Sequence, residues 1–310
     1  MIVGDGSSTK TLSERVAIRH LQSLRDMLPI VKLQRMIWGY GKPNAGLPYP
    51  ARALFAISES GGHVAGAFIK SNIVGFSLAW LGTNRFTGEN YLHSQLMGVL
   101  QSFRHLSIGY QLKLDQKNFA QNRNLDLVKW PFDPLRSANA NLNIRKLGAV
   151  VRSYKPDYYG QMDSDFNQGL TTDRVWAEWY ISSNRVCQRL AGVSIASEQK
   201  LTKLPKLTCV LTDENKKSLL KHVDYEPNKK EQQLLVELPD DFQTLVDSQL
   251  SLAKEWQAKI RDILQKYFQN GYIITDFLTV SDQQRRSFYL ITQDPLHHIL
   301  EGKRKDIRGN

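Results

Sequence analysis

The sequence predicts a mixed α+β fold, a twisted and largely antiparallel sheet flanked by helices, with a C-terminal β-α-β-β extension. Two apolar runs at 63–69 and 73–81 are joined by a short polar turn, which predicts an antiparallel strand pair. A strand-to-helix segment at 91–123 follows, and a long amphipathic helix lies between strand-like segments after residue 231. With 310 residues and 41% hydrophobic content, the chain can bury a sizeable core.

Hydrophobic periodicity assigns the elements in order, since a period of two residues predicts a strand and a period of 3.6 predicts a helix. Before the polar loop at 82–90 we expect a strand at 16–21, a helix or helix pair up to residue 38, a short helix at 53–58 and the strand pair. Beyond residue 124 we expect strands at 125–132, 149–154, 173–182 and 207–211, with a short helix at 137–147. The last unit is a strand at 232–238, a helix at 252–267 and a hairpin of 272–278 and 287–292, which either extends the main sheet or forms a second layer.

The segment 91–123 organises the chain. Tyr91 and His93 alternate with leucines, which predicts a strand, and apolar residues from Ile108 onward fall at helical spacing. The first N–H groups of a helix lack intrahelical partners and lie at the positive end of its dipole. A strand, a small-residue turn and a helix therefore form an arrangement that binds anions, phosphates included.

The residues 99–112, VLQSFRHLSIGYQL, resemble the acetyl-CoA loop of the GNAT superfamily of CoA-dependent N-acyltransferases, V-L-P-x-x-R/Q-x-x-G-x-G/A-x-x-L. Arg104 and Gly109 match this pattern. Gln101 stands where proline is usual, and Ser107 stands where the first glycine is usual. Serine is small and can offer a hydroxyl to a phosphate.

A second stretch, 137–149, lies where the family carries N-x-x-A-x-x-x-Y-x-K-x-G-F. Ala140, Lys146 and Gly148 match, whereas Ser137 and Ile144 replace the asparagine and the tyrosine. The chain thus resembles a GNAT-like branch that departs from the family pattern.

The resemblance implies acetyl-CoA or another acyl-CoA as co-substrate, bound along the central segment. The implied contacts are the backbone of Met97, Gly98 and Val99 at the thioester, the loop residues Arg104, His105, Leu106, Ser107, Ile108, Gly109 and Tyr110, and the amides of Asn139 and Asn143 along the CoA arm.

The implied reaction is acyl-CoA-dependent acyl transfer, in the expected form N-acetyl transfer to a primary amine of a small molecule or peptide by direct attack in a ternary complex. Proximity supplies much of the rate of such a reaction. The alternative is a non-catalytic module that binds a CoA ligand or a partner on the same fold. Ile144 favours the alternative, because in much of the family a tyrosine there lies near the leaving thiolate.

Two residues are candidates for the general base. His93 lies on the central strand, and its ordinary pKa suits proton removal near neutral pH, although it can equally be a histidine at the surface or the core edge. Glu178 is flanked by aromatic residues whose packing would raise a carboxyl pKa. It can equally form a salt bridge with an arginine such as Arg174.

The charge pattern makes nucleic acid an unlikely partner. The net charge is +11 and the isoelectric point is about 9.5. The basic residues are nevertheless dispersed, the densest cluster lies in a tail at 303–308, and no zinc-finger or RRM motif accompanies it. A basic surface also attracts an anionic ligand such as CoA.

Composition indicates a cytoplasmic protein. Two cysteines fit a reducing compartment, and no apolar run approaches the roughly 20 residues of a membrane helix, so we expect no membrane partner. The scattered histidines predict no metal site, and the P-loop and G-x-S-x-G motifs are absent.

Three segments divide the chain. We expect residues 14–182 to form the GNAT-like acyl-CoA-binding domain, and residues 183–231 to form a poorly defined connection. Residues 232–292 form a β-α-β-β unit, which we expect to pack on the core because about 60 residues barely cover a long helix.

Overall fold

The computed structural model describes residues 15–40, 47–160, 169–193, 201, 203–212, 218–222, 231–239, 241–281 and 285–302. The basic tail at 303–308 and parts of the predicted connection lie outside these residues.

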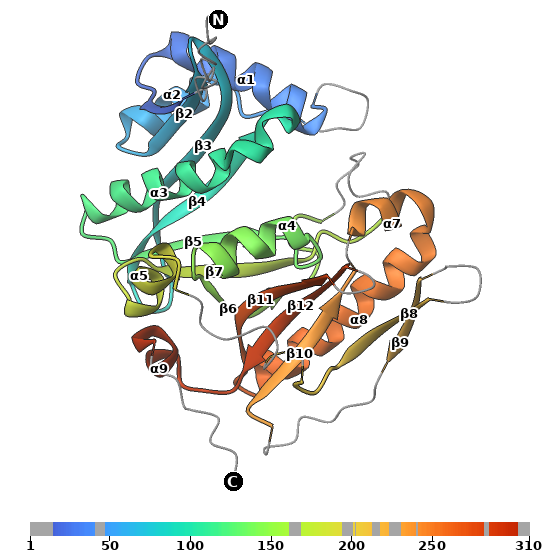
Figure 1. The fold of residues 1–310 in the computed structure, drawn as a ribbon. Coiled ribbons are helices and arrows are strands. Elements are labelled where there is room, and N and C mark those ends of the chain that lie inside the picture. The colour runs from blue at the N-terminus through green and yellow to red at the C-terminus, as the bar shows by residue number, and fades with distance from the viewer. Residues whose placement is uncertain are drawn as a thin grey trace, which may run out of the picture.

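A ten-stranded sheet forms the centre of the molecule (Figure 1). Its strands are β1 (Val16–His20), β2 (His63–Ile69), β3 (Asn72–Thr83), β4 (Asn90–Val99), β5 (Leu127–Phe132), β6 (Val150–Lys155), β7 (Arg174–Tyr180), β10 (Gln233–Leu238), β11 (Ile273–Ser281) and β12 (Arg285–Thr292). Their spatial order is β1-β2-β3-β4-β5-β7-β6-β11-β12-β10, and the pairs are antiparallel except β4 with β5. The predicted mixed fold with a largely antiparallel sheet is therefore confirmed. A separate hairpin joins β8 (Thr208–Thr212) and β9 (Ser218–His222).

Helices from all parts of the chain flank the sheet. They are α1 (Leu24–Trp38), α2 (Ala51–Glu59), α3 (Ile108–Gln121), α4 (Ser137–Ala140), α5 (Asn184–Leu190), α7 (Phe242–Ser248), α8 (Leu250–Gln269) and α9 (Leu296–Glu301), with a 3-10 turn η1 (Gln101–Leu106) and a π-helical turn η2 (Asn141–Lys146). None of the helices in the described part of the chain combines the length and apolarity of a membrane span.

Local chemistry sets the bounds of α1. Ser23 and Asp26 form a reciprocal capping box at its start, and Gly39 ends it in the left-handed conformation with φ 72°. Pro29 lies in the second turn, so the segment predicted as a helix or helix pair is one helix.

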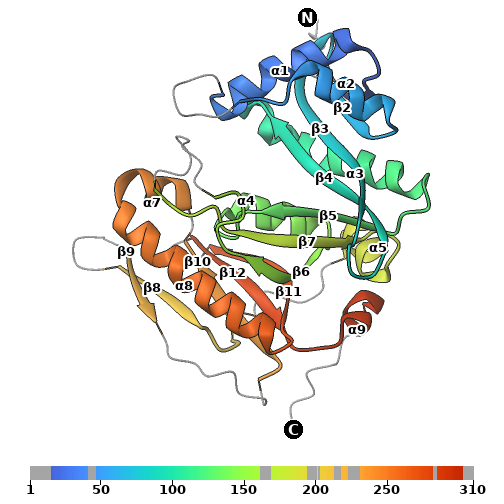
Figure 2. The same cartoon turned by 180° about the vertical axis from the view of Figure 1, so that it is seen from behind.

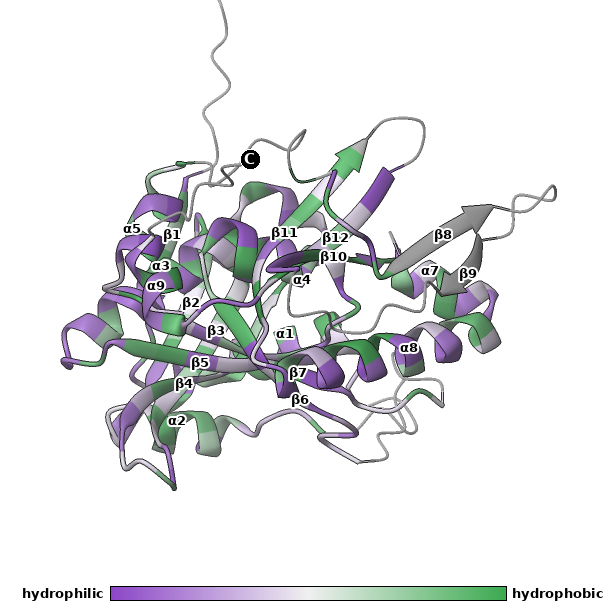
Figure 3. Cartoon of the chain, turned by 90° about the horizontal axis from the view of Figure 1, so that it is seen from below, coloured by the Kyte–Doolittle hydropathy of each residue, from purple (hydrophilic) through white to green (hydrophobic). Residues whose placement is uncertain are grey.

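The main sheet continues into the C-terminal strands, because β11 pairs with β6 at Ile274–Val151. Figure 2 shows α8 lying across this part of the sheet. Apolar and polar residues mark different sides of α8 (Figure 3), and Trp256 and Ile260 lie on its buried side. The same apolar cluster contains Trp179 of β7 and Trp256 of α8.

Candidate active site

β4 and β5 run together at one end and separate at the other. Their pairing is limited to Leu92–Val128 and His93–Lys129. β4 then continues to Val99 along β3, and Figure 1 shows it diverging from β5. This opening leaves main-chain groups of β4 that β5 does not pair, and buried main-chain groups require hydrogen-bond partners.

The chain turns from β4 into α3 through η1. Ser107, at the end of this turn, adopts the left-handed conformation with φ 56°. Glycine reaches this region more readily than serine, which explains why a glycine is usual at this position in the family pattern. The side chain of Ser107 makes no capping hydrogen bond to α3.

A cavity of about 440 Å³ borders the beginning of α3. It is lined by Ser107, Tyr110, Arg145, Lys146, Arg189, Leu190, Gly192 and Val193. Arg145 and Arg189 lie 2.9 and 2.7 Å from the same oxygen of Asp276, and Lys146 is exposed. Cationic side chains around the first turn of a helix favour the binding of phosphate groups.

The predicted cofactor residues of the central segment form one continuous strand–turn–helix. Met97, Gly98 and Val99 end β4, Arg104, His105 and Leu106 lie in η1, and Ser107, Ile108, Gly109 and Tyr110 surround the start of α3. Arg104 Nε donates to the carbonyl of Val99 at 3.3 Å, which folds this side chain back onto the strand. Ser107 and Tyr110 line the cavity.

The two predicted asparagines lie elsewhere. Asn139 is exposed in α4 and Asn143 is buried in η2, and neither lines the cavity. Arg145 and Lys146 of η2 line it instead, so the basic side chains of that turn face the beginning of α3.

His93 lies on the sheet face opposite α3. Its neighbour Ser94 accepts a hydrogen bond from Lys113 of α3 at 2.9 Å, and successive side chains of a strand point to opposite faces. The rings of Trp80 and Trp176 lie 5.4 and 5.7 Å from the imidazole.

One ring nitrogen of His93, Nδ1, carries no proton and is the basic atom of the imidazole. Nε2 lies 2.8 Å from Oε1 of Gln95, so Nε2–H donates to that amide oxygen. Nδ1 is buried and has no hydrogen-bond partner within the described residues. Burial lowers the pKa of His93 below its ordinary value of 6.5, so the ring is neutral at neutral pH.

Glu178 lies in the same cross-strand row as His93. Lys129 of β5 pairs with His93 on one side and with Glu178 on the other. Glu178 is 5% exposed, and its carboxylate lies 2.8 Å from Arg152 Nε and 3.4 Å from Lys129 Nζ. The salt bridge considered for this residue exists, but with Arg152 and Lys129 in place of Arg174.

Lys113 occupies the angle between the diverging strands. It is 2% exposed, donates to Ser94 of β4, and places its ammonium 3.5 Å from the ring centre of Trp130 in β5. Burial lowers the pKa of Lys113 well below its ordinary value. Within the described residues its contacts are the Ser94 hydroxyl and the Trp130 ring, and neither is a carboxylate.

Comparison with known proteins gives matches to solved structures alone. No family model matches the chain, and no curated protein matches it. The ribosomal-protein-S18-alanine N-acetyltransferase of Escherichia coli is 11% identical over 54% of this chain and 95% of its own, with a TM-score of 0.43. A GNAT-family acetyltransferase of Streptococcus pneumoniae is 13% identical over 53% and 98%, with a TM-score of 0.41. The NatC complex bound to Gag peptide and CoA is 16% identical over 54% and 99%, also with a TM-score of 0.41.

The GNAT-like arrangement of this chain rests on its own geometry. A largely antiparallel sheet and the turn through Ser107 into α3 are the features that the sequence resemblance predicts, and the divergence of β4 from β5 accompanies them.

Sequence reasoning missed several residues of the site. Arg189 comes from α5, a seven-residue helix in a stretch without clear periodicity. Lys113 follows Leu112 in a helix, where a lysine is ordinarily expected in solvent. The adjacent basic pair Arg145–Lys146 before Gly148 was the sequence feature that could have indicated the cavity wall.

Proposed function

We propose that this chain is an acyl-CoA-dependent N-acyltransferase, which transfers an acetyl or longer acyl group to a primary amine of a small molecule or peptide. The observation that carries the proposal is the basic cavity at the beginning of α3, the helix that follows β4, together with the early end of the pairing between β4 and β5. Its charge suits the phosphates of CoA, and the unpaired edge of β4 suits the amide groups of the pantetheine arm.

In this proposal the phosphates lie near Ser107 and Lys146, and the arm follows β4 past Met97, Gly98 and Val99. Main-chain N–H groups of that strand polarise the thioester carbonyl, as donors do in other acyl transfers. The amine then attacks the carbonyl carbon, the carbon–sulfur bond breaks, and the thiolate leaves with the bonding electrons.

His93 is the proposed base. Its neutral imidazole accepts at Nδ1 a proton from the attacking amine, directly or through a water, while Gln95 fixes the ring by accepting from Nε2. Glu178 is the second predicted base. We propose that Glu178 acts as a positioning residue, because its carboxylate binds Arg152 and Lys129.

The second candidate function is a non-catalytic module that binds CoA. One observation favours it: Ile144, which stands at the position of the family tyrosine, is fully buried in the main apolar cluster. No phenol at that position protonates the leaving thiolate.

An assay of thiol release separates the two functions. Acetyl-CoA and longer acyl-CoAs are incubated with the chain and a panel of amines, amino acids and peptides. We expect amine-dependent release of free thiol and formation of the amide, measured by mass spectrometry. Binding of CoA without turnover across the panel supports the non-catalytic module, and absence of binding excludes both.

A further inference from the structure

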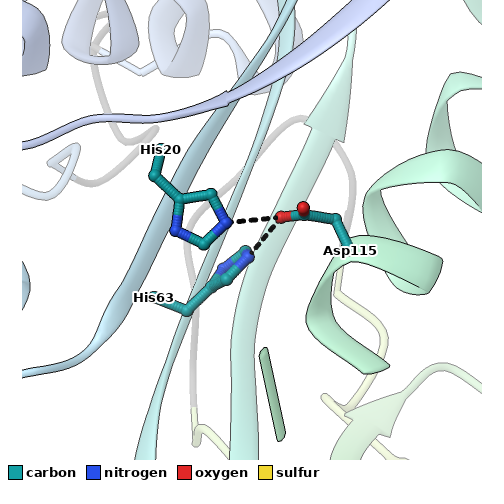
Figure 4. Close-up of side chains that lie close together, drawn as sticks. All are labelled: His20, His63 and Asp115. Carbon is teal, nitrogen blue, oxygen red and sulfur yellow. Dashed lines mark hydrogen bonds and ion pairs between the residues drawn. The ribbon is translucent and has the colours of Figure 1, made fainter. Parts of the chain in front are cut away.

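Three side chains converge beneath α3 at the β1–β2 edge of the sheet. His20 ends β1, His63 begins β2, and Asp115 lies in α3. Because His20 pairs with Ala65 in antiparallel register, His63 lies two residues away on the same face. Figure 4 shows both imidazoles pointing at the carboxylate of Asp115.

The contacts meet at one atom. Nε2 of His20 and Nε2 of His63 lie 3.1 and 2.7 Å from Oδ2 of Asp115. The ligand atoms of the three residues all lie within 4.8 Å of one another. Within the described residues, this is the cluster of three His, Cys, Asp or Glu side chains that could hold a metal ion.

We propose that Nε2 of His20, Nε2 of His63 and the carboxylate of Asp115 bind a divalent transition-metal ion, Zn²⁺ by the chemistry of the donors. Two imidazoles and one carboxylate are a common ligand set for zinc, with a fourth position left to water or substrate. The site is independent of the proposed acyltransfer.

The spacing fits such an ion after a small adjustment. Tetrahedral zinc with bonds of about 2.0–2.1 Å separates its ligand atoms by about 3.4 Å. The present separations from Asp115 are 2.7 and 3.1 Å, so each imidazole nitrogen needs to move away from that oxygen by less than about 1 Å.

The hydrogen bond with Asp115 raises the pKa of His20, so a metal ion competes with a proton for this ring, whereas the other two ligands are already in the forms that bind metal. Burial lowers the pKa of His63, so its ring is neutral, as metal coordination requires. Burial opposes ionisation of Asp115, but hydrogen bonds from both histidines outweigh it and hold its pKa well below the usual range. Asp115 is therefore an ionised ligand.

The surroundings leave one side of the cluster open. Phe119 packs against the imidazoles of His20 and His63, with ring centres 5.9 and 4.9 Å away. A cavity of about 350 Å³ adjoins His20 and is also lined by Glu59 and Arg123. The fourth position can thus hold water or a small anion.

A bound ion would join three elements that are distant in sequence. It would hold α3 against β1 and β2 at Asp115, two turns into the helix. The proposed CoA site lies at the beginning of the same helix. We therefore expect the metal to raise thermal stability. The scattered histidines predicted no metal site, because only the fold brings residues 20, 63 and 115 together.

The test uses the full chain after treatment with a chelator. Zn²⁺ is titrated by calorimetry, and Co²⁺ reports coordination geometry through its visible absorption. We expect one equivalent of metal, an absorption spectrum of tetrahedral cobalt and a higher Tm that a chelator reverses. His20→Ala and Asp115→Asn should each weaken binding at least tenfold.

The matched control is His298→Ala, since His298 also contacts a carboxylate, that of Asp294, at 3.1 Å. The control should bind metal like the natural chain. Because His20 is exposed, His20→Ala should melt cooperatively without metal, which separates loss of ligand from loss of fold. The proposal is wrong if no equivalent binds, if His20→Ala binds metal as tightly as the natural chain, or if His298→Ala loses binding.

Discussion

The two edges of β5 differ in how they are used. Along β7 the strand pairs at every step from Leu127–Tyr180 to Phe132–Val175, whereas along β4 it pairs only at Leu92–Val128 and His93–Lys129. The β7 edge belongs to the main apolar cluster, which contains Trp130 and Trp179. The β4 edge leaves the main chain of residues 94–99 without a partner in β5.

From this difference we infer that the β7 edge of β5 serves the stability of the fold and that the β4 edge serves binding. Strand pairing that continues through β7, β6 and β11 builds the core, and pairing that stops early leaves main-chain groups for a ligand. Changes on the β7 side should therefore act on folding, and changes on the β4 side should act on binding and catalysis.

The largest effect, on folding, is expected when the chain is expressed as two fragments, because the β7 side of the core is built from both. The apolar cluster joins Val151 and Trp179 to Trp256 and Ile274, so neither 1–200 nor a fragment from Lys230 can bury its share alone. We expect both fragments to be insoluble or to melt without cooperativity, measured by circular dichroism. A fragment from Lys230 that melts cooperatively, together with residues 1–200 that bind CoA unchanged, would show that the C-terminal unit is independent.

The next largest effect is expected at His93, where β4 still pairs with β5. His93→Ala should lower kcat by about 10²–10⁴-fold, the usual contribution of a general base, with little change in CoA affinity. Since burial lowers the pKa of His93, activity of the natural chain should fall as the pH drops through a midpoint below 6.5. A stopped assay over a pH series measures both quantities.

Glu178→Gln is the matched comparison. It should lower stability by about 1–3 kcal/mol, because Arg152 and Lys129 lose their carboxylate, and should lower kcat less than His93→Ala does. If Glu178→Gln abolishes turnover without loss of stability and His93→Ala does not, the roles are reversed.

A substitution of Lys113 tests how a buried lysine between β4 and β5 affects stability. Lys113→Met removes a buried ammonium that, among the described residues, contacts Ser94 and the Trp130 ring and no carboxylate, and should raise stability by about 1 kcal/mol at neutral pH. Between the lowered pKa of Lys113 and about 10.4, the unfolded chain binds more protons, so stability of the natural chain rises with pH. Urea unfolding at several pH values should show that rise for the natural chain and lose it in the variant.

The smallest effect is expected at the cavity. Lys146 is exposed, so Lys146→Met should weaken CoA binding only about two- to fivefold and reduce its dependence on salt. Lys117→Met is the control, because Lys117 bonds Gln121 farther along α3. Equal affinities for both variants at low salt would place the phosphates elsewhere.

Most strands and helices could be predicted because their periodicity is local. The strand pair β2–β3 and the turn into α3 follow from alternating residues and small turn residues. The short α5 and the separation of 137–147 into α4 and η2 could not, since neither carries a periodic pattern of sufficient length. Whether the C-terminal strands extend the sheet depends on the pairing of Ile274 with Val151, which is not local.

The candidate site was predictable in its backbone and less so in its side chains. Residues 97–110 form the predicted strand–turn–helix because Ser107 can take the place of a glycine, at a cost of about 1 kcal/mol. The cationic lining from Arg145 and Arg189 is fixed by their shared contact with Asp276, which lies more than eighty residues farther along the chain.

Calorimetric titration of CoA tests the central claim, that the beginning of α3 beside the β4–β5 opening binds an acyl-CoA. A Cβ atom at Gly109 would lie 3.6 Å from Leu142 and from Met97, an ordinary contact, so Gly109→Ala should fold and bind CoA within a few-fold of the natural chain. Gly109→Val should lose binding, because its branched side chain blocks the approach of the phosphate to the backbone. The account predicts one equivalent of CoA for the natural chain and for Gly109→Ala and none for Gly109→Val. Absence of heat and of any thermal shift with millimolar CoA, or equal binding by all three, would contradict it.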